Sequence, residues 1–136
     1  MPALPFLDTN IILRHLTQDH ADHSPRATAY FARIEQGEFE VYTADTVIFE
    51  SVYTLERVYR QTKAAVREGL LPLLELDGII LPGKPKYRRV FDLYVSYNLS
   101  FGDAYHVGLM ESLQLTEMVS FDQGLDRIPT IQRIEP

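Results

Sequence analysis

Residues 4–16, Leu-Pro-Phe-Leu-Asp-Thr-Asn-Ile-Ile-Leu-Arg-His-Leu, pass from a short apolar run to a helical pattern through a single acidic residue, Asp8. The run from Leu4 to Leu7 indicates a first buried strand that ends at Asp8. Asn10 to Leu16 has apolar residues at helical spacing, which predicts a short helix immediately after the strand. A strand followed at once by a helix is the repeating unit of α/β proteins, so this stretch indicates the fold class.

The alternation of short strands and longer helices continues along the chain. Further strands are predicted at residues 39–44, 78–81, 118–121 and 131–134, with helical periodicity between them. Strands joined by helical crossovers run parallel in one sheet, with helices on both faces. We therefore predict a three-layer α/β/α fold with a central, mainly parallel sheet. The chain of 136 residues has no linker or internal repeat, which predicts a single domain over residues 1–136.

Polar residues that suit helix N-caps mark the predicted helix starts. They are Ser24 before Pro25, Asp45 or Thr46, Thr62, and Ser100, which has capping-box spacing with Asp103. The helix from Asp45 or Thr46 is expected to run to about Arg60. Pro72 is expected to bend or restart the helix after Thr62, because proline lacks a backbone donor. Another helix is predicted from Pro85 to Tyr97.

Composition and charge exclude several classes of protein. The chain is 46% hydrophobic and 24% charged, which is typical of a globular domain and excludes general disorder. It lacks an apolar run of the roughly 18 residues that span a membrane, and its N-terminus lacks a signal-peptide pattern, so we expect a cytoplasmic protein. The absence of cysteine excludes disulfide scaffolds and thiol nucleophiles. The net charge of −6 argues against nonspecific electrostatic binding of nucleic acid, unless bound cations offset the negative charge.

Two predicted strands end in an aspartate, Asp8 and Asp122. In open parallel sheets, ligands bind beyond the carboxyl ends of the strands. Glu50 and Asp103 lie near the starts of predicted helices, and a helix that follows a strand begins at that same edge. The four carboxylates can therefore converge at one rim, where cations would neutralise their charge. Ligands made only of oxygen suit Mg²⁺ or Mn²⁺ rather than zinc.

Each acidic residue also has a purely structural interpretation. Asp8 can cap the short helix, Asp103 can complete a capping box, and Asp122 can form a turn. Glu50 is harder to explain in this way, because a carboxylate between apolar neighbours is costly to bury without a partner. His106, one turn after Asp103, suits core or surface packing better than metal ligation or catalysis.

Short strings of residues carry the acids in a consistent order. They are Leu7-Asp8-Thr9-Asn10-Ile11, Phe49-Glu50-Ser51-Val52-Tyr53-Thr54-Leu55, Ser100-Phe101-Gly102-Asp103-Ala104 and Val119-Ser120-Phe121-Asp122. In their order, spacing and placement on strands or helices, these strings resemble a PIN domain over nearly the whole chain. The chain length is similar to that of the stand-alone PIN ribonucleases that serve as VapC-type toxins.

This resemblance implies a Mg²⁺- or Mn²⁺-dependent endoribonuclease that hydrolyses RNA phosphodiester bonds by metal-activated water. It also implies the toxin of a VapBC-type toxin–antitoxin system, a homodimer that a small antitoxin holds inactive. The catalytic and metal-binding residues would be Asp8, Glu50, Asp103 and Asp122, supported by Thr9, Asn10 and Ser120. Asp122 matches the least constant acid of the family, and whether Asp126 assists or replaces it is left open.

Three other functions fit parts of the sequence. One is a PIN fold without catalysis that only binds RNA or a protein. A receiver-type signalling domain would need paired acids after the first strand and a late lysine, but Asp8 stands alone and no lysine follows Lys86. A structure-specific DNA nuclease is generally larger, with inserted segments. If RNA is the substrate, cations should flank the acids, and the candidates are Arg14, Arg57, Arg60, Lys84, Lys86, Arg88 and Arg89.

Overall fold

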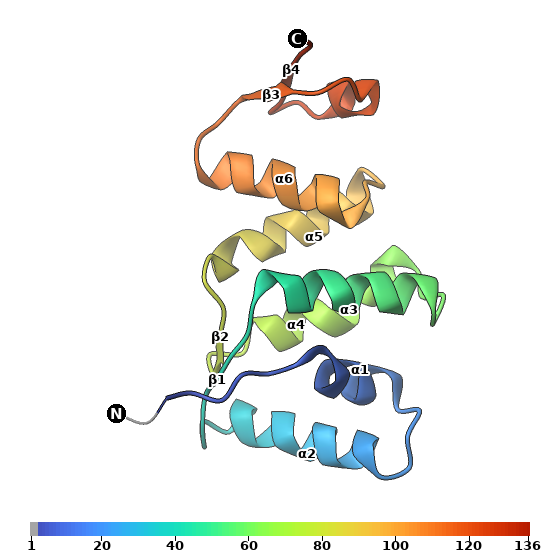
Figure 1. Ribbon diagram of the computed structural model, residues 1–136, viewed down its shortest axis with the longest axis vertical. Coiled ribbons are helices and arrows are strands. Elements are labelled where there is room, and N and C mark those ends of the chain that lie inside the picture. The colour runs from blue at the N-terminus through green and yellow to red at the C-terminus, as the bar shows by residue number, and fades with distance from the viewer. Residues whose placement is uncertain (1–2) are drawn as a thin grey trace. The chain divides into compact units, whose positions relative to one another are not determined.

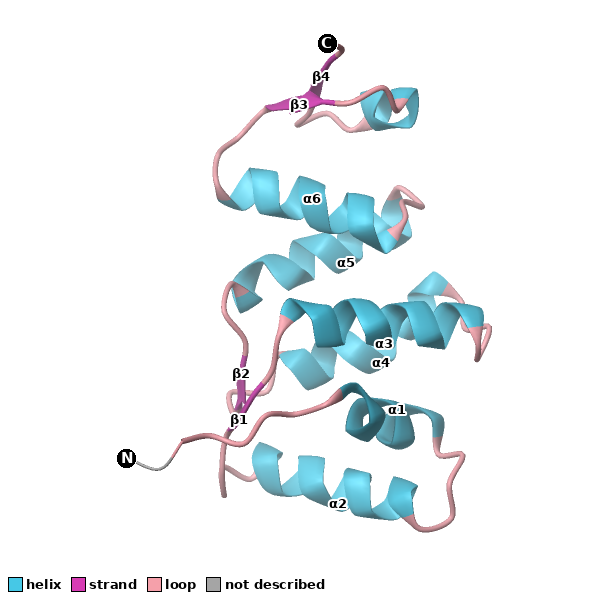
Figure 2. Cartoon of the chain, in the orientation of Figure 1, coloured by secondary structure: helices cyan, strands magenta, loops and turns pink. Residues whose placement is uncertain are grey.

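The computed structural model describes residues 3–136, which form two compact units (Figure 1). The first unit ends at Lys84 and the second begins at Pro85. Both units contain helices and a pair of parallel strands (Figure 2), which agrees with the predicted α/β class. Among residues 3–136, no helix is both long enough and apolar enough to cross a membrane.

The first unit places helices beside a short parallel strand pair. Its helices and strands are α1 (Thr9–Thr17), α2 (His23–Glu35), β1 (Val41–Tyr42), α3 (Asp45–Arg57), α4 (Lys63–Leu74) and β2 (Ile79–Ile80). The two strands pair in parallel, with Val41 opposite Ile79. Phe6 forms an isolated parallel bridge with Tyr42. The predicted strand at residues 4–7 is therefore reduced to a bridge, although its direction is as expected.

The core of the first unit comes from the apolar faces of its helices. On α3, Ile48 and Leu55 are completely buried and lie two helical turns apart. On α4, Val66 and Leu70 lie one turn apart and are also completely buried. Ile12 of α1 is 1% exposed. Because α3 contacts both α1 and α4, these faces hold the start of α1 against α3.

The second unit consists of a helix pair followed by a second parallel strand pair. Its elements are α5 (Tyr87–Ser96), α6 (Phe101–Ser112), β3 (Glu117–Val119), the 3-10 helix η2 (Gln123–Arg127) and β4 (Gln132–Ile134), and a 3-10 turn η1 (Lys84–Lys86) precedes α5. Phe101 packs against the rings of Phe91 and Tyr94, with centroid distances of 5.1 and 5.4 Å. Strands β3 and β4 are parallel, with Met118 opposite Arg133.

Strand lengths and sheet organisation differ from the prediction. The paired segments are two or three residues long, and among the described residues they form two separate ladders, one in each unit. The sequence had predicted one sheet. The parallel direction within both pairs is confirmed. The region predicted as helix at Pro85–Tyr97 begins as η1 and becomes α-helical at Tyr87.

Two of the predicted helix caps are confirmed. The hydroxyl of Thr62 accepts a hydrogen bond from the Ala65 N–H at 3.1 Å, at the start of α4. The hydroxyl of Ser100 accepts from the Asp103 N–H at 3.2 Å, at the start of α6. Helix α4 continues through Pro72 to Leu74, so of the two expected effects of this proline, a bend or a restart, the restart does not occur.

The predicted cap at Ser24 is wrong, because a histidine ring does the capping. Helix α2 begins at His23, and the Nδ1 atom of His20 accepts from the N–H groups of Asp22 and His23 at 3.2 and 2.9 Å. Ser24 is buried instead, and its hydroxyl accepts from the His20 N–H at 3.2 Å. The ring therefore satisfies backbone donors that a helix start leaves unpaired.

Helix α3 also begins and ends differently from the prediction. Its N-cap is Ala44, which makes no side-chain cap, so neither Asp45 nor Thr46 caps it. It ends at Arg57 rather than near Arg60, and Arg60 has a φ of 54°. This left-handed conformation cannot continue a right-handed helix, so the helix does not include Arg60.

Candidate functional site

One threonine joins two of the predicted acidic residues in the first unit. The Thr9 N–H donates to Oδ1 of Asp8 at 2.8 Å, and the Thr9 hydroxyl donates to Oε2 of Glu50 at 3.1 Å. Thr9 is 3% exposed, whereas both carboxylates are exposed. A buried side chain therefore brings together two solvent-facing acids, although Thr9 and Glu50 are 41 residues apart in sequence.

Local structure explains how each of these acids is positioned. Asp8 has an extended backbone and is the N-cap of α1, so its side chain bonds to the first helical N–H. The positive end of the helix dipole also favours a carboxylate at this point. Glu50 lies in the second turn of α3 and is exposed, so the expected burial cost does not arise. Burial of Ile12 and Ile48 holds α1 and α3 in contact.

A pocket of about 700 Å³ adjoins Asp8 in the first unit. Its polar lining includes Asp8, Asn10, Arg14, His23, Arg26 and Tyr30. Asn10 is exposed in the first turn of α1, two residues after Asp8. The pocket combines cationic groups with the predicted metal ligand, and its volume is in the range of small-molecule sites.

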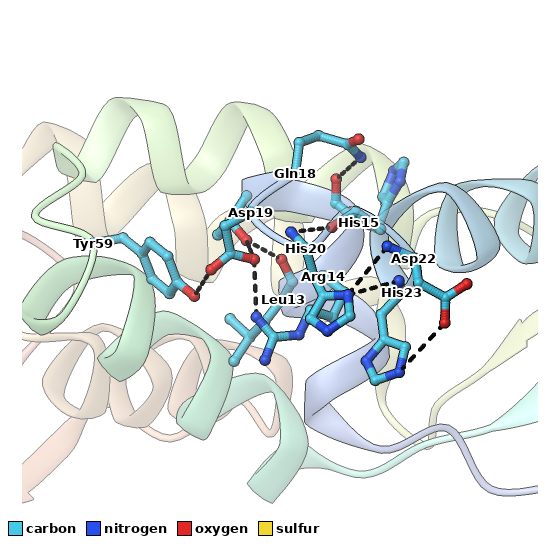
Figure 3. A network of polar contacts seen from close by, with 11 residues as sticks. Leu13, Arg14, His15, Gln18, Asp19, His20, Asp22, His23 and Tyr59 are labelled. Carbon is cyan, nitrogen blue, oxygen red and sulfur yellow. Dashed lines mark hydrogen bonds and ion pairs between the residues drawn. The ribbon is translucent and has the colours of Figure 1, made fainter.

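Arg14, at the edge of this pocket, is held by Asp19 (Figure 3). Its Nη1 donates to Oδ1 of Asp19 at 2.9 Å. Asp19 also accepts from the hydroxyl of Tyr59 at 2.6 Å and from that of Thr17 at 2.8 Å. The Tyr59 and Thr17 hydrogen bonds, with a smaller contribution from Arg14, hold the pKa of Asp19 well below its usual range. Sequence reasoning missed this network, because Tyr59 and Asp19 are 40 residues apart.

The second unit positions its acidic residues through local turns. Asp103 is half-buried in the first turn of α6, where its N–H is bound by Ser100. Asp122 is exposed, and its Oδ1 accepts from the Gly124 N–H at 2.9 Å at the start of η2. The hydroxyl of Ser120 accepts from the Asp122 N–H at 3.0 Å. The predicted turn at Asp122 is therefore confirmed, and at Asp103 the bond to the Ser100 hydroxyl uses the backbone N–H, which leaves the carboxylate open to a second role.

The structure thus brings Asp8 together with Glu50, and Ser120 together with Asp122. Within residues 3–136, neither unit contains a group of three or more His, Cys, Asp or Glu side chains that could hold a metal ion. The four-acid metal site stays a prediction. The donors that are present, carboxylate and hydroxyl oxygens, are those that Mg²⁺ and Mn²⁺ prefer, so the Asp8–Glu50 pair fits such a cation chemically.

Several cations predicted to contact RNA have partners inside the chain. The Nζ atom of Lys84 donates to the carbonyls of Leu76 and Ile79 at 2.7 and 2.6 Å, and burial lowers its pKa. Arg89 makes a two-point ion pair with Glu111, with distances of 2.8 and 3.2 Å. Lys84 and Arg89 therefore have structural roles. Arg14 is also ion-paired, with Asp19, but it lines the pocket beside Asp8.

The PIN domain family model matches residues 6–131. The chain belongs to the PIN domain family. The match runs through both units of this PIN domain and includes all the acidic residues identified from the sequence. It confirms the predicted α/β PIN-like fold. PIN domains are generally nucleases that use divalent metal ions. Comparison with curated proteins gives no match.

Proposed function

We propose that this PIN domain is a Mg²⁺-dependent endoribonuclease whose catalytic and metal-binding residues are Asp8, Glu50, Asp103 and Asp122. The main support is the hydrogen bonding of two exposed carboxylates, Asp8 and Glu50, to the buried Thr9. Exposed, preorganised carboxylates suit a cation that must also reach a substrate, and the family is one of nucleases.

When bound, a divalent cation would supply hydroxide near neutral pH and stabilise charge on the attacked phosphate. The chain's own residues prepare the ligands. The Thr9 hydroxyl fixes the Glu50 carboxylate, and the Thr9 N–H fixes Oδ1 of Asp8. Each carboxylate keeps further lone pairs for a cation, because ionised Asp and Glu together offer about eight acceptor positions. Residues that orient ligands in this way commonly matter almost as much as the ligands.

The proposed substrate is RNA, which PIN nucleases bind. In the pocket beside Asp8, Arg14 and Arg26 can contact phosphates, and Asp19 orients the guanidinium of Arg14. Arginine suits this role, since its planar donors match phosphate geometry. We expect cleavage to weaken with added salt, because phosphate contacts release counterions.

We further propose that this nuclease is the toxin of a VapBC-type pair, a cytoplasmic homodimer held inactive by a small antitoxin. The support is surface chemistry on the first unit. Tyr53 on α3 and Val58 just after it are 64% and 67% exposed, and large exposed apolar side chains are common at protein interfaces. Sedimentation of the chain with and without a protein encoded beside it tests this assignment.

Incubation of the purified chain with total RNA tests the nuclease. We expect cleavage with Mg²⁺ or Mn²⁺, loss of cleavage with a chelator, and defined cut ends on mapping. Asp8→Asn should lower the cleavage rate by about 1,000-fold, because it removes the charge of a proposed metal ligand. At about 1.4 kcal/mol for each factor of ten, this corresponds to about 4 kcal/mol of activation free energy. The matched control is Asp77→Asn, an exposed aspartate of the same unit, which should cleave normally. Full activity of Asp8→Asn would refute the assignment, and RNA binding without cleavage would indicate a PIN fold that only binds.

A further inference from the structure

Arg133 of β4 has an unusually complete set of partners. Its Nε and Nη2 atoms donate to the two carboxylate oxygens of Asp126 at 2.8 and 3.2 Å. Its Nη1 donates to the carbonyl of Ser120 at 3.1 Å and to Oε1 of Glu135 at 2.6 Å. The side chain is only 12% exposed. All three guanidinium nitrogens are therefore engaged, and the two carboxylates that bind them are about half exposed.

These bonds hold both ends of one loop, residues 120–126. At one end, Arg133 binds the Ser120 carbonyl, and the Ser120 hydroxyl accepts from the Asp122 N–H. At the other end, Arg133 binds the carboxylate of Asp126. Asp122 lies between these two points, and its Oδ1 is bonded to Gly124 within the same loop. Asp122 therefore lies in a loop that one guanidinium holds at both ends without a hydrogen bond to Asp122 itself.

We propose that Arg133 is a positioning residue for the nuclease site, holding the loop 120–126 so that Asp122 can bind the divalent cation. This inference rests on the proposed function. It also assigns Asp126: this carboxylate acts through Arg133 and is not itself a metal ligand.

The choice of residue supports this role. Only arginine offers a planar fork that can bind a carboxylate at two points while donating to a carbonyl and to a second acid. The hydrogen bond from Arg133 holds the pKa of Asp126 below its usual range, so this carboxylate stays ionised and paired. A carboxylate with both oxygens in an ion pair is a poor candidate for ligation, because binding a cation would compete with the arginine.

The test measures divalent-cation binding directly and by activity. Mn²⁺ binding to the whole chain is followed by the electron paramagnetic resonance signal of the free ion, and the Mg²⁺ concentration for half-maximal RNA cleavage is measured in parallel. For Arg133→Gln we expect both the Mn²⁺ dissociation constant and the Mg²⁺ half-saturation to rise about tenfold or more, as for other residues that orient metal ligands. Asp126→Asn should have a similar effect, and combining it with Arg133→Gln should add little.

Two matched controls separate positioning from general stability. Glu135→Gln removes the negative charge of one partner of Arg133 and leaves the bonds of Arg133 to Ser120 and Asp126. Arg89→Gln removes the ion pair with Glu111, which involves no residue of the loop. A purely structural role would lower the amount of folded protein without changing cation affinity per folded molecule. We expect both controls to keep normal affinity.

The outcomes are distinct. Unchanged cation affinity in folded Arg133→Gln, or an equal loss in Arg89→Gln, overturns the inference. If Arg133→Gln does not fold, Asp126→Asn decides by the same measurement. Complete loss of Mn²⁺ binding in Asp126→Asn with a small effect in Arg133→Gln would make Asp126 a ligand and would also overturn it. If the unmodified chain binds Mn²⁺ but does not cleave RNA, the proposed function fails, while the binding data still test Arg133.

Discussion

The two units hold their acidic residues by different means. In the first unit, a long-range hydrogen bond from Thr9 to Glu50 joins α1 to α3 and brings Glu50 together with Asp8. In the second unit, Asp103 and Asp122 are each held by a partner two or three residues away. The long-range contact there comes from Arg133, which holds the loop rather than the acid. A long-range bond thus reaches an acidic side chain in the first unit, whereas in the second unit short-range bonds hold the acids and the long-range bonds hold the loop.

This difference has a physical cause. In the first unit the acids sit on or next to helices whose packed apolar faces fix their separation. Apolar support is uneven in the loop after β3: Phe121 is 71% exposed, whereas Leu125 is 3% exposed and packs in the core of the second unit. Polar contacts support the exposed part of this loop around Asp122, and the guanidinium of Arg133 provides several of them at once.

The largest expected effect tests whether both units serve one reaction. Asp103→Asn should lower RNA cleavage by about 1,000-fold, as severely as Asp8→Asn, through loss of a ligand charge. The fold should persist, because Asp103 uses its backbone N–H, not its carboxylate, in the bond to Ser100. Cleavage rates and circular dichroism check this, with Glu117→Gln as the control. A loss below tenfold would place catalysis in the first unit alone.

The next effect compares the two hydroxyl groups that flank the acids. Thr9→Val keeps the side-chain shape and removes the donor to Glu50, so we expect a loss of cleavage of about 10- to 100-fold, which is the usual cost of removing a residue that orients a metal ligand. Ser120→Ala removes only a bond to a backbone N–H and should cost less. Thr9→Ser restores the donor and should recover most activity. Measured cleavage rates that fall equally in Thr9→Val and Ser120→Ala would contradict the distinction between the units.

A smaller effect concerns packing in the second unit. A Cβ atom at Gly108 would lie 2.5 Å from Cγ2 of Val90, so Gly108→Ala should lower the free energy of unfolding by about 1–3 kcal/mol. Gly102, on the same helix, has open space around it, so Gly102→Ala should raise the free energy by about 0.5–1 kcal/mol. Urea unfolding followed by circular dichroism measures both. A biphasic curve for Gly108→Ala would show that the units unfold separately.

The smallest effect is a pH dependence. The hydrogen bond from Arg89, helped by one from Thr130, lowers the pKa of Glu111 from its ordinary 4.5. A lowered carboxyl pKa stabilises the fold above the unfolded pKa, and this contribution is lost as the pH falls below it. In Glu111→Gln the free energy of unfolding should therefore fall less steeply below about pH 5 than in the unmodified chain. The difference should be less than about 1 kcal/mol, because the Arg89–Glu111 pair is partly exposed. Melting temperatures between about pH 3 and pH 7 test this. Unchanged acid sensitivity would contradict it.

Local chemistry was the part of this molecule that could be predicted from the sequence. The caps at Thr62 and Ser100 and the turn at Asp122 each depend on residues two or three positions apart. The cap at Ser24 failed for a related reason: a histidine four residues earlier satisfied the backbone donors at the helix start, and imidazole capping has no strong sequence pattern. Strand lengths were overestimated because apolar runs do not show where ladder pairing stops.

The sequence by itself determined the α/β class, the order of helices and strands, their parallel direction and the acidic strings that mark a PIN domain. These features follow from apolar periodicity and short-range hydrogen bonding, which neighbouring residues encode. Only the tertiary structure decided that Thr9 bonds to Glu50, that Asp19 binds Tyr59 and that Arg133 holds both Ser120 and Asp126. Such contacts depend on how packed helices and strands bring distant side chains within about 3 Å, a distance that no local pattern specifies.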